Sequence, residues 1–178
     1  MRKKLLKQKQ FKKAYCFLVE GKTEEHYINL LKKIYEKVVR VECCNGGGAN
    51  GVLMHSKKYI ADKKGLFSDF IILYDEDTIA GEKESVNEHE KALDNLKPES
   101  VRRIVFNPCF EQWILWHFKK KKENTCEKVT SVLKKHIPDY QKNDFEQIEK
   151  YIDKEKIQEV LKLQTTDNFT EIINQVFN

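Results

Sequence analysis

The chain has 178 residues, the length of one ordinary domain or of one domain with a small appendage. Apolar residues make up 40% of it and aromatic residues 11%, which is enough for a packed core and argues against wholesale disorder. The net charge is +5 at pH 7, with Lys and Arg crowded into residues 1–13 and 119–122. Such lysine-rich stretches are most often solvated surface, but they also suit a polyanionic partner.

The cysteines indicate the redox environment of the protein, and the apolar runs indicate whether it crosses a membrane. The five cysteines form no Cys-x-x-Cys pair and follow no signal peptide, so we expect a reduced, cytoplasmic protein without disulfides. The apolar runs are too short for a membrane span. Residues 1–13 have no apolar targeting segment, and we expect them to form a basic arm.

The first expected strand, residues 14–19, is apolar on both faces and runs directly into Glu20 and Gly21. Gly21 allows a tight turn, and Thr23 is the expected N-cap of a helix. The apolar residues that follow have the spacing of one buried helical face: Tyr27, Leu30, Leu31, Ile34 and Val38. Glu20 is therefore predicted at the tip of a buried strand.

Glu24 lies in the first turn of that helix, beside Glu20. An acid at this position complements the helix dipole, and that alone would account for it. The Gly-Lys-Thr triplet at residues 21–23 does not form a nucleotide-binding P-loop, because strand residues stand where that motif needs its upstream glycine.

A second strand is expected over residues 38–43 and a helix over residues 52–63. Between them, residues 45–51 hold four of the seven glycines. Such a segment predicts a flexible loop near the site rather than a dedicated phosphate cradle.

The central strand is predicted over residues 69–74, where five consecutive apolar or aromatic residues indicate burial on both faces. It runs straight into Asp75, Glu76 and Asp77. Asp75 and Asp77 are two residues apart, so in an extended segment their side chains point the same way. Paired carboxylates at the carboxyl end of such a strand suit Mg²⁺, Mn²⁺ or Ca²⁺.

A further helix (residues 86–93) and a last strand (residues 101–106) precede Asn107 and Pro108, the expected N-cap and first residue of the next helix. Glu111 lies in its first turn, either as a dipole-complementing surface residue or as part of the site. We expect His117 to be a partnered core histidine. Beyond residue 119 only helical patterns remain, over residues 126–136, 145–151, 154–162 and 168–176.

Together these elements predict an α/β fold. Residues 14–120 would form a mostly parallel sheet of about four strands flanked by helices, and residues 121–178 a helical extension packed on it. Acids then follow the first and third strands, and a glutamate after the first strand with a later Asp-x-Asp is the arrangement of Toprim domains.

The chain resembles the RloB-like family, bacterial proteins related to Toprim domains. Three stretches carry the resemblance: residues 19–24 (VEGKTE), 74–77 (YDED) and 107–118 (NPCFEQWILWHF), of which the last is the most specific. The resemblance implies a Toprim-like Rossmannoid fold with a carboxylate cluster that binds Mg²⁺.

The same resemblance implies roles for individual acids. Glu20 would be a general acid/base or a metal ligand, and Asp75 and Asp77 would be the metal-binding pair. Glu24 would be the second acid of the nuclease-type EGxxE pattern and a further ligand. Glu111 is a candidate catalytic residue whose role in the family is less clear.

RloB-like proteins are associated with restriction-modification and abortive-infection loci, often beside an ATPase of the AAA or ABC type. We therefore expect a metal-dependent nuclease that acts on DNA or RNA in phage defence. Two alternatives stay open: a non-catalytic nucleic-acid-binding or regulatory subunit of an ATPase complex, and a nucleotidyl-transfer enzyme. A purely structural reading leaves the acids at the strand tips without a reason.

Overall fold

The computed structural model describes residues 14–76, 79, 81–96, 100–142, 145–163 and 168–178. The basic arm expected at residues 1–13 and the expected metal ligand Asp77 lie outside these residues. In the described part of the chain, no helix is both long enough and apolar enough to cross a membrane.

The centre of the molecule is a four-stranded sheet in which all neighbouring strands are parallel. Its strands are β1 (Tyr15–Val19), β2 (Arg40–Cys43), β3 (Asp69–Asp75) and β4 (Val101–Phe106), in the spatial order β2-β1-β3-β4. The predicted α/β fold is confirmed. The strand order reverses between β1 and β3, and in sheets of this kind ligands bind at the carboxyl ends of the strands at that point.

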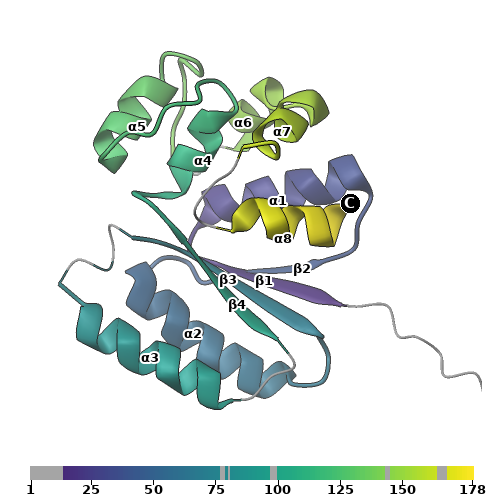
Figure 1. Ribbon diagram of the computed structural model, residues 1–178, viewed down its shortest axis with the longest axis vertical. Helices are drawn as coiled ribbons and strands as arrows, with labels where there is room; N and C mark the ends of the chain where they lie inside the picture. Colours follow the sequence, from purple (N-terminus) through teal and green to yellow (C-terminus); the bar gives the residue numbers. More distant parts are fainter. Residues whose placement is uncertain (1–13, 77–78, 80, 97–99, 143–144, 164–167) are drawn as a thin grey trace, which may run out of the picture.

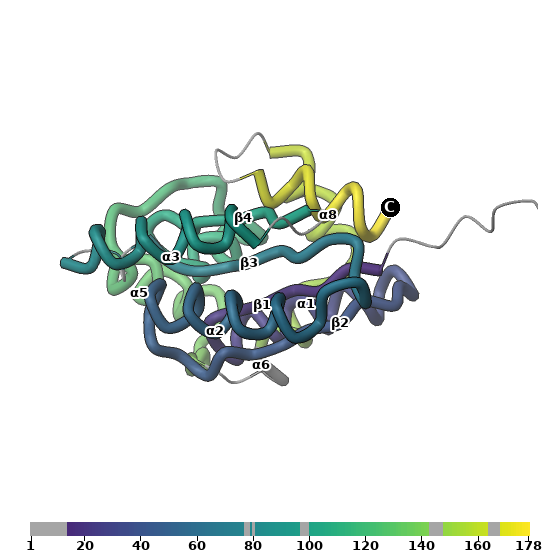
Figure 2. The backbone as a smooth tube through the Cα atoms, turned by 90° about the horizontal axis from the view of Figure 1, so that it is seen from below, coloured from purple at the N-terminus to yellow at the C-terminus, as the bar shows by residue number. Residues whose placement is uncertain are grey.

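Helices cover both faces of the sheet (Figure 1). One face carries α1 (Lys22–Tyr35) and α8 (Phe169–Phe177), and the other carries α2 (Gly48–Lys63) and α3 (Lys83–Asn95). Towards the carboxyl ends of the strands lie α4 (Phe110–Trp116) and α5 (Cys126–Leu133). The helices α6 (Phe145–Tyr151) and α7 (Lys154–Val160) lie over α1, on its side away from the sheet. The view at 90° shows the last helix, α8, close above β4 (Figure 2).

Alternating side chains in the strands build a core on each face of the sheet. In β3, Ile71 and Leu73 belong to the larger core, while Phe70 and Ile72 belong to the smaller one. All of β3 is buried, including Asp75 at its end. The strand thus ends in a carboxylate that lies at the carboxyl end of the sheet and has little contact with water.

The first helix begins and ends earlier than the sequence pattern predicts. Its N-cap is Gly21, because the Glu24 carboxylate accepts a hydrogen bond from the Gly21 N–H (3.2 Å), and Thr23 is buried in the first turn. The helix ends at Tyr35, so Val38 is 94% exposed and does not belong to the buried face.

Two other helices begin at unexpected positions. The helix expected from residue 52 begins at Gly48, after Gly46 and Gly47 with φ of 83° and 96°, so only the first part of the glycine-rich segment is a loop. The helix expected from Pro108 begins at Phe110, because the Asp75 carboxylate accepts a hydrogen bond from the Phe110 N–H (2.8 Å).

Cys109 and Cys126 form a disulfide, which corrects the expectation of a chain without disulfides. They lie at the starts of α4 and α5, two helices that pack together and bring their Cα atoms to 5.9 Å. The two residues are 17 apart in the sequence, and nothing in their spacing indicates that they meet. The other cysteines are free: Cys16, Cys43 and Cys44.

Candidate functional site

Four acids from separate segments gather at the carboxyl end of the sheet. Glu20 follows β1, Glu24 lies in the first turn of α1, Asp75 ends β3, and Glu111 lies in the first turn of α4. A pocket of about 340 Å³ opens there, at the β1/β3 reversal. Its lining residues are Glu20, Gly21, Lys22, Glu24, Cys43, Asn45, Gly46, Asp75 and Lys142.

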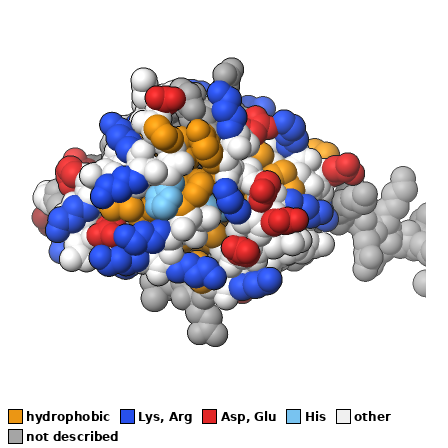
Figure 3. Space-filling view, turned by 90° about the horizontal axis from the view of Figure 1, so that it is seen from above, with side chains coloured by type: hydrophobic (Ala, Val, Ile, Leu, Met, Phe, Trp, Pro, Cys, Tyr) orange, Lys and Arg blue, Asp and Glu red, His pale blue; other side chains and the backbone are white. Residues whose placement is uncertain are grey.

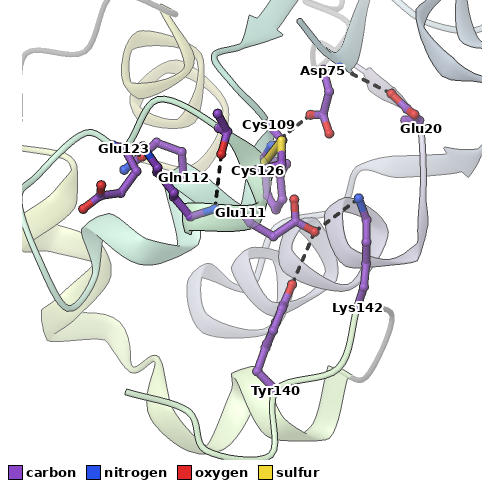
Figure 4. Close-up of a disulfide and its surroundings, with 12 residues drawn as sticks. Glu20, Asp75, Cys109, Glu111, Gln112, Glu123, Cys126, Tyr140 and Lys142 are labelled. Atoms are coloured by element: carbon purple, nitrogen blue, oxygen red, sulfur yellow. Dashed lines mark hydrogen bonds and ion pairs between the residues drawn. A yellow bond between two sulfur atoms is a disulfide. The ribbon is translucent and has the colours of Figure 1, made fainter. Parts of the chain in front are cut away.

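Asp75 is the centre of this group. Its backbone N–H donates to Glu20 Oε2 (3.3 Å), and its side chain accepts the bond from the Phe110 N–H (Figure 4). The residue is only 3% exposed. Burial, followed by the negative charges of Glu24, Glu111 and Glu20, raises the pKa of Asp75 to about 9.

Glu24 is also buried, with 4% of its surface exposed. Burial, together with the charges of Glu111 and Glu20, raises its pKa to about 7, although the hydrogen bond from the backbone acts in the opposite direction. An acid that merely complements a helix dipole is solvated, so the surface interpretation of Glu24 does not hold.

Glu111 joins the group from α4 and is likewise 3% exposed. The Tyr140 hydroxyl donates to its Oε1 atom over 3.4 Å, and Lys142 Nζ lies 3.4 Å from the same oxygen (Figure 4). The surface interpretation of Glu111 is therefore wrong as well. Two residues of the segment that follows α5 contact a single carboxylate at the sheet edge.

The geometry can hold a metal ion. One ligand atom each from Asp75, Cys109 and Glu111 lies within 4.8 Å of the other two. The sulfur of Cys109 is bonded to Cys126, so it is not a thiolate ligand in this state, and the two carboxylates are the donors that remain. Carboxylate oxygens are the donors that hard divalent cations prefer.

Three features of the site carry no signal in the sequence. Tyr140, Lys142 and the Cys109–Cys126 pair reach it only through the packing of the C-terminal helices. The glycine-rich segment was predicted near the site, and Asn45 and Gly46 do line the pocket.

His117, by contrast, lies outside the pocket. Its Nε2 atom lies 3.1 Å from the Tyr27 hydroxyl and its Nδ1 atom 3.0 Å from the Trp113 carbonyl oxygen. Burial lowers its pKa to about 4, so the ring is neutral at pH 7. The prediction of a partnered core histidine is confirmed.

Fold and site together define a Rossmann-like α/β protein with buried carboxylates at the reversal point of a parallel sheet. The chain belongs to the RloB-like protein family, whose model matches residues 15–173, nearly the whole chain. Neither a comparison with curated proteins nor one with solved structures found a match.

Proposed function

We propose that the protein is a metal-dependent nuclease of the Toprim type that hydrolyses phosphodiester bonds in DNA or RNA. The observation that carries the proposal is the gathering of four acids at the β1/β3 reversal, three of them buried. Like charges buried together are unfavourable unless protons or a cation neutralise them. The raised pKa of Asp75 reflects how unfavourable its charged form is in this buried place beside the other acids.

The donor set fits Mg²⁺ or Mn²⁺. Asp75 and Glu111, whose carboxylate oxygens lie within 4.8 Å of each other, would hold the ion, and Glu20 or Asp77 would add a further carboxylate. When bound, such an ion neutralises the phosphate and activates a water molecule for in-line attack. Its charge would also relieve the repulsion between the acids.

Glu24 suits proton transfer at this site. A carboxyl group with a pKa of about 7 both accepts and donates a proton readily near neutral pH, as general acid–base catalysis requires. The hydrogen bond from the Gly21 N–H fixes the orientation of its carboxylate. We therefore assign Glu24 to proton transfer and the other acids to the ligand set.

The lysine-rich segment that follows α4 would suit a polyanionic substrate, although Glu123 lies 4.0 Å from Lys119 Nζ and 3.7 Å from Lys121 Nζ. Gln112 in α4, next to Glu111, fixes the lysine-rich segment 119–122: its Nε2 donates to the Lys121 carbonyl oxygen (3.0 Å), and its Oε1 accepts from the Glu123 N–H (2.8 Å). Lys and Arg side chains are spread over the face that carries α4 to α7, with acids between them (Figure 3). Such charges hold a phosphate backbone without reading its sequence.

The biological setting is proposed on family membership alone. By that relationship the protein would act in the cytoplasm, in phage defence, beside an ATPase partner of the AAA or ABC type. A cytoplasmic setting would keep the Cys109–Cys126 pair reduced, since disulfides rarely persist there.

The test is cleavage of mixed DNA and RNA substrates with Mg²⁺ or Mn²⁺. Wild-type protein should cleave only with metal, and Asp75→Asn and Glu20→Gln should each lower the rate about 100-fold or more. Glu88→Gln, an exposed acid on α3, is the matched control and should cleave like wild type.

Other results would select the alternatives. Nucleic-acid binding without cleavage, with or without an ATPase, would favour a non-catalytic subunit. Metal-dependent incorporation of labelled nucleotides would favour nucleotidyl transfer. Cleavage that survives in both acid variants would refute the proposed site.

A further inference from the structure

Lys142 has an unusual position for a lysine. Its side chain is 64% exposed, yet its Nζ atom lies 3.4 Å from the Oε1 atom of Glu111, which is 3% exposed. The other lysine that lines the pocket, Lys22, is engaged elsewhere, because its Nζ atom lies 2.7 Å from Glu25 Oε2. Lys142 therefore brings positive charge from the outer surface to the mouth of the carboxylate pocket (Figure 4).

The fold holds the backbone of Lys142 at this place. Tyr140, two residues earlier, is 1% exposed, belongs to the larger core and donates its hydroxyl hydrogen to the same Glu111 oxygen. Ile137, earlier in the segment between α5 and α6, is fully buried. The segment thus has a rigid base in the core, while the lysine side chain, with its four-carbon stem, retains freedom to move.

The charges around the pocket indicate what this ammonium group contacts during function. Without a divalent ion, the lysine is a counter-ion for the buried acids. A divalent ion bound by the carboxylates would neutralise the acids in place of Lys142. The ammonium group would then remain at the mouth of the pocket without being needed as their counter-ion. A phosphodiester held over the ion carries further negative charge, and its non-bridging oxygens accept hydrogen bonds from lysine.

We propose that Lys142 is a phosphate-binding residue of this site, which contacts a non-bridging oxygen of the substrate held over the carboxylate cluster. The substrate class rests on the proposed function, but binding and cleavage are separable measurements. A purely structural role is the competing explanation. As the counter-ion of the buried Glu111 carboxylate, Lys142 would on that explanation stabilise the fold, so Lys142→Met would lower the unfolding midpoint and leave substrate binding unchanged.

The test is binding of short, fluorescently labelled single-stranded DNA and RNA oligonucleotides in Mg²⁺, measured by anisotropy. Lys142→Met should weaken binding about tenfold, the loss expected for one charge-assisted hydrogen bond. Lys142→Arg keeps the charge and should stay within about threefold of wild type. Lys58→Met, which removes an exposed lysine of α2 on the other face of the sheet, is the control and should change binding less than about twofold.

Equal binding by wild type and Lys142→Met would overturn the proposal, as would an equal loss in Lys58→Met. Absence of binding by wild type to either probe would overturn it too. An unchanged unfolding midpoint for Lys142→Met shows that a loss of binding is not a loss of fold. If wild type binds through Lys142 but cleaves nothing, the nuclease proposal fails and the lysine assignment stands.

Discussion

At the scale of single residues, the main feature of the protein is a carboxyl group that the fold forces into an unfavourable place. Asp75 must lie at the end of a strand that is buried throughout, and three other acids surround it. Its pKa rises from 3.8 to about 9. The folded protein therefore binds the Asp75 proton more tightly than the unfolded chain does, so the free energy of unfolding falls as the pH rises through that range.

Replacing the ionisable carboxyl group of Asp75 with a neutral amide should therefore stabilise the protein. In the absence of divalent cations at pH 8, Asp75→Asn is expected to raise the free energy of unfolding by about 1–3 kcal/mol, because the amide has the same shape and has neither a charge to bury nor a proton to take up on folding. The gain should shrink at pH 5, which is closer to the pKa of 3.8 that Asp75 has in the unfolded chain, so that protonating it on folding costs less free energy. Denaturant unfolding at the two pH values measures both quantities.

The control for this prediction is Asp62→Asn, an exposed acid at the end of α2, which should stay within about 0.5 kcal/mol of wild type at both pH values. A destabilised Asp75→Asn at pH 8 would contradict the burial of an unneutralised charge.

The acids of the site could be predicted because each one directly follows a strand or begins a helix. Glu20 and Asp75 come at the points where apolar runs end, and such points meet at one edge of a parallel sheet. Lys142 could not be predicted in the same way. Its contact with Glu111 depends on how the C-terminal helices pack, and no local periodicity encodes a contact over that sequence distance.

At the scale of elements, α4 is tied to its surroundings at its first turn. The Phe110 N–H is bonded to Asp75, and Cys109 is bonded to Cys126 at the start of α5. Strands β1 and β3 were evident from their apolar runs, since burial on both faces leaves little room for polar residues. Strands β2 and β4 are only partly buried and contain charged residues, among them Glu42 and Arg103, so their sequence signal was weaker. The helix starts were predicted less well, because a carboxylate from another element or a glycine turn sets them.

The disulfide between α4 and α5 should contribute to stability only while it is formed. Under non-reducing conditions, Cys126→Ser is expected to lower the free energy of unfolding by about 2–4 kcal/mol, because a closed loop of this length restricts the unfolded chain. With a thiol reductant present, wild type and variant should unfold alike. Denaturant curves with and without reductant provide the comparison. If wild type and Cys126→Ser differed in their free energy of unfolding by the same amount under both conditions, the covalent contribution would be refuted.

At the scale of the whole molecule, the last helix is part of the main core. Phe169 in α8 is fully buried, and its ring lies 4.8 Å from that of Trp113 and 5.1 Å from that of Phe106. Strand β4, helix α4 and the chain terminus thus share one aromatic cluster. The C-terminal helices support the edge of the sheet at which the acids lie.

Truncation of that aromatic cluster should therefore destabilise the whole fold. Phe169→Ala is expected to lower the free energy of unfolding by about 3–5 kcal/mol, since it leaves a cavity among buried rings. Phe169→Leu should lose much less, and Glu171→Ala, at an exposed position of the same helix, should lose under about 0.5 kcal/mol. Unfolding followed by both circular dichroism and tryptophan fluorescence tests this. A transition confined to the fluorescence signal would contradict a single shared core.

The order of the elements around the pocket also has a consequence for synthesis of the protein. Parallel strands cannot pair through tight turns, so β1 must wait for β2 and β3, each of which follows a helix. Glu20 leaves the ribosome early, Glu111 only after the last strand, and Lys142 later still. A nascent chain therefore holds these groups apart until residue 142 has been made, and the carboxylate pocket with its lysine is incomplete before that point.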